Sequence, residues 1–246
     1  MQKKTKESPK QQDGLSLKNK HLTIHKELYR QRTCFNARFF LYLCRIFTRT
    51  IVIMTKANKV LFITQEITPY VSESEMANIG RHLPQAIQEK GREIRTFMPK
   101  WGNINERRNQ LHEVIRLSGM NLIIDDTDHP LIIKVASIQS ARMQVYFIDN
   151  DDYFQNRLQT ADENGVEYDD NDSRAIFYAR GVLETVKKLR WCPDVIHCHG
   201  WMTALAPLYI KKAYKDEPSF RDAKVVFSVY EDDFKGTFNN DFASKL

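Results

Sequence analysis

The sequence predicts an α/β domain that is doubly wound around a mainly parallel sheet and carries a β-hairpin insertion. Three observations predict it. Short apolar runs such as residues 60–63 (VLFI) are typical of strands that are buried on both faces. Helix-period patterns lie between these runs, and the order of strand and helix repeats along the chain. In domains of this class, ligands bind beyond the carboxyl ends of the strands.

The first unit, within residues 59–84, is a strand, a polar loop and a helix. Apolar residues at spacings of three and four predict one buried helix face, made of Met76, Ile79, Leu83 and Ile87. Gly91 stands where a helix C-cap is wanted, and residues 93–98 predict a second strand.

The middle of the chain predicts the hairpin insertion. Its apolar segments are short and separated by turn residues: 114–117, 122–124, 131–135 and 145–148. We expect the last of them to return to the main sheet.

The last part of the chain, from about residue 172, continues the alternation of helices and strands. Asp172 or Ser173 can cap a helix that runs to about Arg190. The predicted inner face of this helix is Ile176, Ala179, Leu183 and Val186. A strand over 194–198, a helix over 202–214 and a buried strand over 224–229 follow.

Charge divides the chain at about residue 53. Residues 1–53 hold 12 Lys and Arg against 3 Asp and Glu, a net charge of +9, whereas the remainder holds 25 against 28. We expect residues 1–53 to be a disordered or spurious extension, with Met54 as the natural start, and residues 54–246 to form the folded domain. A membrane-surface or RNA-binding arm and a degenerate targeting segment are the alternatives.

Composition disfavours several classes of protein. The apolar block Phe39–Cys44 is far shorter than the roughly 20 residues of a membrane span, and no signal-peptide cleavage site follows it. The folded part is mildly acidic, which argues against a nucleic-acid surface. Four cysteines in 246 residues do not make a disulfide framework, so we expect a reducing, cytoplasmic location and no cofactor.

The first candidate site is the loop of residues 64–75. A phosphate-binding turn uses glycines together with a lysine or a free helix N-terminus. This loop has no glycine and carries Glu66, Glu73 and Glu75, whose carboxylates satisfy the helix dipole and repel an anion. We therefore expect a capped helix start, with Ser72 or Ser74 as the cap.

The second candidate is the segment of residues 195–201 (VIHCHGW). His197 and His199 are two residues apart, so they share one face of a strand. Cys192 and Cys198 lie nearby, but the spacing matches no closed zinc site and we expect no metal. A ligand-facing histidine and a structural histidine both remain open.

The third candidate is the loop after the last strand, Tyr230–Asp233. Its carboxylates, Glu231, Asp232 and Asp233, can serve acid–base catalysis, bind a cation or simply form a solvated loop. No Ser/His/Asp or Cys/His nucleophile can be assigned from the spacing.

Six blocks taken together resemble one known family. They are KVLFITQEITPY (59–70), MANIGRHLPQAI (76–87), YFIDNDDYF (146–154), DDNDSRAIFYARGVLE (169–184), PDVIHCHGWMTALAPLYIK (193–211) and KVVFSV (224–229). In order and spacing they are similar to the N-terminal domain of bacterial glycogen synthases and plant starch synthases, over about residues 59–236. The resemblance implies one Rossmann-like half of a GT-B fold. In that family glucose passes from ADP-glucose to the non-reducing end of an α-1,4-glucan, and the C-terminal domain holds most of the donor.

The resemblance also implies which positions face the donor, and there this chain departs from the family. Where the family has Lys-Thr-Gly-Gly, the chain has Ser72, Glu73, Ser74 and Glu75, and the Asp that follows is Asn78. The family's His-Asp-Trp-His is His199, Gly200, Trp201 and Met202 here, so the histidine that faces the transferred sugar is Met202. Its later His-Asn is Tyr230 and Glu231.

Other family positions are kept. They are His197, His199, Trp201, the block Asp149–Tyr153, Asn171 and Arg174. Of these, the resemblance makes five the candidate substrate-binding residues: His199, Trp201, Asp149, Tyr153 and His197.

The replacements remove phosphate attraction and close backbone approach together, and electrostatic stabilisation of the departing group is usually the largest catalytic term. We therefore expect a glycogen- or starch-synthase-like domain without independent catalysis. It would bind α-glucan or maltooligosaccharide, act in regulation or dock a partner. The alternative is glucosyl transfer from ADP-glucose or UDP-glucose together with a separate C-terminal half. A remnant without a ligand is the third hypothesis.

Overall fold

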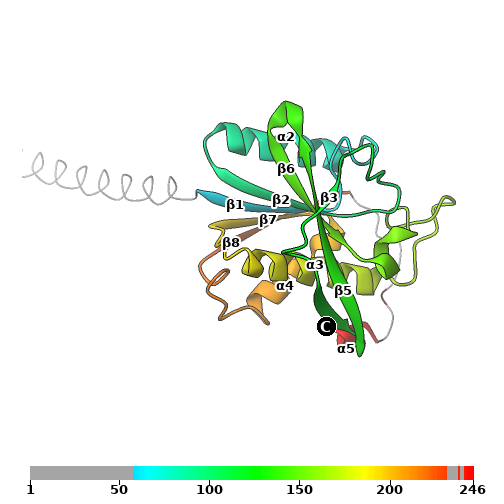
Figure 1. Ribbon diagram of the computed structural model, residues 1–246. Helices are drawn as coiled ribbons and strands as arrows, with labels where there is room; N and C mark the ends of the chain where they lie inside the picture. The colour runs from blue at the N-terminus through cyan, green and yellow to red at the C-terminus, as the bar shows by residue number, and fades with distance from the viewer. Residues whose placement is uncertain (1–57, 232–237, 239–240) are drawn as a thin grey trace, which may run out of the picture. The chain divides into compact units, whose positions relative to one another are not determined.

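The computed structural model describes residues 58–231, 238 and 241–246. The expected extension over 1–53 and the carboxylates of Asp232 and Asp233 lie outside the described residues. Within them, helices cover both faces of one sheet: α2 (Glu75–Glu89) lies on one face, and α3 (Asn171–Lys188) and α4 (Leu205–Lys211) lie on the other (Figure 1). No helix in these residues is both long and apolar enough to cross a bilayer.

Five parallel strands form the centre of the sheet. They are β1 (Lys59–Thr64), β2 (Glu93–Pro99), β6 (Met143–Asp149), β7 (Val195–His199) and β8 (Lys224–Ser228). Their spatial order is β6–β2–β1–β7–β8, and every neighbouring pair is parallel. In chain order this is 3-2-1-4-5, so the predicted doubly wound fold is confirmed. The strand order reverses between β1 and β7, where such folds form their ligand crevice.

The predicted hairpin insertion is also present. β5 (Thr127–Ile138) pairs antiparallel with β6 and with two short strands, β3 (His112–Glu113) and β4 (Met120–Ile124). The segment expected at 114–117 is a turn rather than a strand, because the amides of Leu117 and Ser118 both donate back to the carbonyl of Val114.

Helix boundaries differ from the predictions in three places. α3 begins at Asn171, and its N-cap Asp170 lies two residues before Asp172 and three before Ser173, the two predicted caps. The helix expected over 202–214 is a 3₁₀ turn, η3 (Trp201–Thr203), followed by the shorter α4. A last turn, α5 (Phe242–Lys245), was not foreseen.

The buried face of α2 is rotated from the prediction. Met76, Ala77, Gly80 and Pro84 are buried, whereas Ile79, Leu83 and Ile87 are only half-buried. The reason is Gly80: a Cβ there would lie 2.4 Å from the carbonyl oxygen of Glu66, so the missing side chain lets α2 approach the loop after β1.

The inner face predicted for α3 is correct, since Ile176, Ala179, Leu183 and Val186 are all fully buried. The prediction of a buried strand at 224–229 is wrong. β8 is the outermost strand of the described sheet, so Val226 is 45% exposed and Phe227 is 39% exposed.

Candidate functional site

The carboxyl ends of β1 and β7 meet at the switch point. Thr64 and His199 are register partners there, so the loop after β1 and the turn after β7 leave the sheet side by side. Behind them, the hydroxyl of buried Tyr178 donates to the carbonyls of Thr64 (2.7 Å) and Phe97 (3.0 Å) and ties the ends of β1 and β2 to α3. The two segments that sequence reasoning singled out separately therefore form one site.

The side chains of Gln65 and Met76 fill the space beside Gly200 at this switch point. Gly200 has a left-handed backbone (φ +80°), and a Cβ on it would lie 2.6 Å from Gln65 Oε1 and 2.8 Å from the sulfur of Met76. Gln65 is held from two sides: its Oε1 accepts from the amide of Met202 at 3.2 Å, and its carbonyl accepts from Trp101 Nε1 at 2.8 Å. Sequence reasoning missed Gln65 and Trp101, because nothing local marks them.

The loop Ser72–Glu75 starts α2 as expected. Ser74 is the N-cap: its hydroxyl accepts from the amide of Ala77 at 2.9 Å and donates to the carboxylate of Glu66. Ser72, Glu73 and Glu75 are exposed, as is Asn78. The helix N-terminus is thus already occupied by side-chain oxygens and carboxylates, which leaves it a poor place for a phosphate.

His197 and His199 do share one face of β7, with ring centroids 4.0 Å apart. His197 Nε2 lies 2.9 Å from Ser228 Oγ, and His199 Nδ1 lies 2.7 Å from the hydroxyl of Tyr230. Phe62 packs beside both rings, at 5.6 Å from His197 and 4.3 Å from His199. The pair is thus bound to the last strand and the loop after it.

Burial sets the protonation of these histidines. His199 is 1% exposed, and its burial, with a smaller effect of His197, lowers its pKa to about 3. Burial also lowers the pKa of His197. Both rings are therefore neutral at pH 7. His199 Nε2 is buried and makes no hydrogen bond within the described part of the chain.

The two positions after β7 differ in accessibility. Met202 is fully buried in the hydrophobic core, while Trp201 is half-buried and packs against the edge of that core. After β8, Tyr230 is half-buried, and burial together with the charge of Glu75 raises its pKa. Glu231 is exposed. The described residues contain no group of three or more His, Cys, Asp or Glu that could hold a metal ion.

Asp149, at the end of β6, lies within an ionic cluster that the sequence did not reveal. Its Oδ2 lies 2.7 Å from Lys134 Nζ, which also lies 2.6 Å from Glu106 Oε1, and Lys100 Nζ lies 3.0 Å from the same oxygen. Burial raises the pKa of Asp149 against the opposing effect of Lys134. The Asp149 side chain thus has an internal partner instead of facing solvent.

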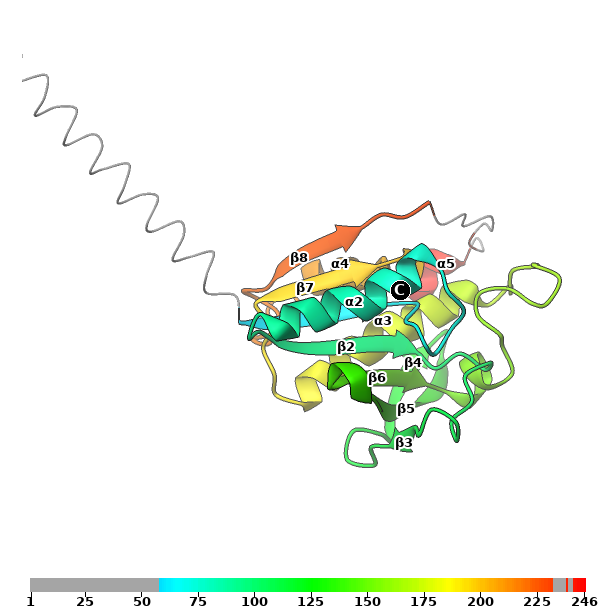
Figure 2. The same ribbon diagram turned by 90° about the horizontal axis from the view of Figure 1, so that it is seen from above.

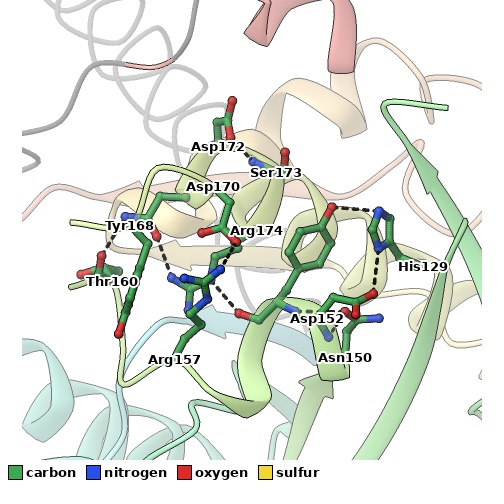
Figure 3. A network of polar contacts seen from close by, with 12 residues as sticks. His129, Asn150, Asp152, Arg157, Thr160, Tyr168, Asp170, Asp172, Ser173 and Arg174 are labelled. Carbon is green, nitrogen blue, oxygen red and sulfur yellow. Dashed lines mark hydrogen bonds and ion pairs between the residues drawn. The ribbon is translucent and has the colours of Figure 1, made fainter. Parts of the chain in front are cut away.

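Tyr153 belongs to a second polar network, which it shares with His129 and Arg174. Figure 3 shows these two partners among the polar contacts near the start of α3. Its hydroxyl lies 3.0 Å from His129 Nε2, and burial raises its pKa to about 12. Its carbonyl accepts from Arg174 Nε at 2.9 Å. Arg174 also donates to Asn171 Oδ1 at 2.6 Å and to the carbonyl of Gln159 at 2.7 Å. The kept residues Asn171 and Arg174 therefore hold the loop before α3.

The fold and the polar loops at the β1/β7 switch point define a Rossmann-like α/β domain. A family profile described as "Starch synthase catalytic domain" matches residues 59–246, and the chain belongs to that family. It is 41% identical over 179 residues to a glycogen synthase of Pelodictyon phaeoclathratiforme, covering 72% of this chain and 37% of that one. It is 41% identical over 173 residues to a glycogen synthase of Chlorobium limicola, covering 70% and 35%.

A solved structure shows the same fold. The catalytic domain of Starch Synthase IV from Arabidopsis thaliana, bound to ADP and acarbose, matches with a TM-score of 0.60 at 20% identity. The match covers 70% of this chain and 34% of that one. The chain thus spans little more than a third of the length of the relatives it matches. Its fold is that of one Rossmann-like half of the GT-B arrangement.

Proposed function

We propose that this chain binds α-1,4-glucan without transferring glucose by itself. The observation that carries the proposal is the filled switch point. Gln65, Met76 and Gly200 occupy the space where the two central strands end, and Met202 is buried where the family's sugar-facing histidine is expected. A donor sugar would have to displace packed side chains, which costs free energy.

The charge of the neighbouring loop supports the same conclusion. Glu73 and Glu75 are exposed within residues 72–75, the stretch where the family resemblance places Lys-Thr-Gly-Gly near the donor diphosphate. Two carboxylates repel the diphosphate, and no lysine is present to offset its charge during transfer. The chain's own chemistry therefore disfavours ADP-glucose.

One kept residue at this end of the sheet suits a glucan. Trp201 is half-buried in the turn after β7, and Glu231, a replacement of the family residue, is exposed after β8. An aromatic ring offers an apolar face to a sugar ring, and carboxylates accept from its hydroxyls. Acarbose in the Arabidopsis structure makes a maltooligosaccharide the natural probe.

Affinity electrophoresis of the full chain in gels that contain glycogen tests the binding. We expect saturable retardation that maltohexaose in the gel reverses. Trp201→Ala should abolish most of the retardation, whereas Trp201→Phe, which keeps an aromatic face, should retain it. Migration that glycogen leaves unchanged would rule out the binding function.

A second function is supported by chain length. Because the chain spans 37% of the Pelodictyon glycogen synthase, a separate C-terminal half could complete a GT-B enzyme. That hypothesis predicts glucose incorporation into glycogen only when such a half is supplied. Retardation without incorporation favours the binding function, and incorporation favours the enzyme.

A further inference from the structure

We propose a second ligand site, for a small phosphorylated sugar, in a pocket at the amino-terminal edge of the sheet. The pocket has a volume of about 500 Å³, which lies within the range of small-molecule sites. Its walls come from the end of α2, the start of β2, the end of β5 and the start of β6. In Figure 2, α2 runs along β2, and β6 lies beside β2.

The charge that faces this pocket is positive. Arg92 and Arg142 line it, and Glu93 is the only carboxylate among its described lining residues. The Glu93 carboxylate is already engaged: it accepts from Trp191 Nε1 at 2.7 Å and lies 3.7 Å from an Arg95 nitrogen. The described lining thus carries two arginines and one glutamate, and the carboxylate of that glutamate has partners of its own. Guanidinium groups bind phosphate oxygens through paired N–H donors, so the pocket favours a phosphate group.

The two arginines are held in place by the fold. Gln88 Nε2 donates to the carbonyl of Arg142 at 3.0 Å, which ties the end of α2 to the turn before β6. Arg142 has φ +51°, a left-handed conformation that is uncommon outside glycine and costs free energy. Arg92 donates to Asn58 Oδ1 at 2.6 Å. Arg142 is exposed and Arg92 is half-buried, so a ligand from solvent can reach both side chains.

The remaining lining supplies neutral hydrogen-bonding groups. Gln88, Gln139 and Gln144 contribute amides, and Ile94 is the one apolar side chain among the described lining residues. Amides both donate to and accept from hydroxyl groups, so this lining suits a polyhydroxylated ligand and offers little to an apolar one. Arginines beside amides point to a sugar that carries a phosphate.

This pocket is independent of the glucan proposal. β2 has seven residues, and a strand rises about 3.3 Å per residue, so its two ends are roughly 20 Å apart. The pocket lies at the start of β2, and the filled switch point lies at the carboxyl ends of the strands. A result at one site therefore leaves the other untouched.

Thermal unfolding of the full chain with added glucose 1-phosphate tests the site, with inorganic phosphate and glucose as separate probes. We expect a saturable rise in Tm with glucose 1-phosphate, a smaller rise with inorganic phosphate at equal concentration, and none with glucose. Arg142→Gln should weaken glucose 1-phosphate binding about tenfold or more, and Arg92→Gln/Arg142→Gln should abolish the shift.

Arg116→Gln is the matched control, because Arg116 is exposed and outside the pocket. It removes the same charge and should leave the shift unchanged. The proposal would be overturned by the absence of a saturable shift with glucose 1-phosphate, or by a shift that the double variant retains in full. An equal effect of inorganic phosphate would also overturn it, since the sugar would then contribute nothing.

Discussion

Gln65 leaves no room for a side chain on Gly200: a Cβ there would lie 2.6 Å from Gln65 Oε1. The contact joins the two strands between which the sheet reverses its order. The family resemblance places an aspartate at position 200, and that side chain cannot be accommodated while Gln65 and Met76 keep their positions. Position 200 must therefore be a glycine as long as Gln65 and Met76 fill this crevice.

Gly200→Ala should lower the free energy of unfolding by about 3 kcal/mol, because it adds left-handed strain of about 1–2 kcal/mol to an overpacked contact. Gly91→Ala is the control. Gly91 has a similar φ of +74° but nothing within 4 Å of its added Cβ, so it should lose only the strain. Urea unfolding measures both, and equal losses would show that residue 200 is not crowded. Adding Gln65→Ala to Gly200→Ala should recover part of the loss.

Arg174→Met should destabilise the domain by about 3 kcal/mol or more, because it leaves buried acceptors at Tyr153 and Gln159 without their donor. The same change at Arg221, which lies outside this network, is the control: its side chain is 63% exposed, and its ion pair with Asp222 should contribute less than about 1 kcal/mol. Denaturant midpoints compare the two. Losses of similar size would mean that the network in Figure 3 does not hold the loop before α3.

Acid should destabilise the fold through His199. Its folded pKa is about 3 because of burial, so the unfolded chain binds a proton near pH 6.5 and the folded chain does not. The stability from neutral His199 is complete above pH 6.5 and is lost as the pH falls toward 3. Between pH 7.5 and pH 5 the loss should be about 2 kcal/mol.

The measurement is the free energy of unfolding against pH for three proteins. His199→Gln should show a shallower fall than the unmodified chain, whatever its stability at pH 7.5. His112→Gln, at an exposed histidine, should follow the unmodified chain. A slope that His199→Gln leaves unchanged would contradict a neutral, buried His199.

Met202→His restores the family's residue at a fully buried position. Burying an imidazole without a partner should cost about 2 kcal/mol or more, whereas Met202→Leu should cost less than about 1.5 kcal/mol. Thermal unfolding distinguishes them. A histidine variant as stable as the leucine variant would mean that position 202 faces open space.

Much of the fold could be predicted because local sequence patterns indicate its strands and helices. The apolar run of β1 and the inner face of α3 both follow from spacing alone. The rotation of α2 could not be foreseen, since it depends on Gly80 meeting a carbonyl on another segment. Nor could the exposure of β8, because the place of a strand in a sheet is not a local property.

The position of the candidate site in the chain could be predicted, but the side chains that pack and hydrogen-bond there could not. The loop after β1 and the histidines of β7 could be singled out from the sequence because the loop follows a buried strand and the histidines lie at the carboxyl end of another. Their partners lie far away in sequence: Met202 is 137 residues from Gln65, and Tyr230 is 31 residues from His199. The fold topology brings such pairs together, and no rule based on the spacing of residues in the sequence identifies them.

The binding function and the second function make opposite predictions when the rest of a GT-B enzyme is supplied: because the switch point is filled and Glu73 and Glu75 repel a diphosphate, the binding function predicts that this chain still supports no glucosyl transfer. The direct measurement is incorporation of labelled glucose from ADP-glucose into glycogen. The full chain would be mixed with the separately produced C-terminal half of the Pelodictyon glycogen synthase, and that enzyme's own two halves would serve as the positive control. We predict incorporation no higher than with the C-terminal half alone. Incorporation that requires this chain and rises with its concentration would contradict the account.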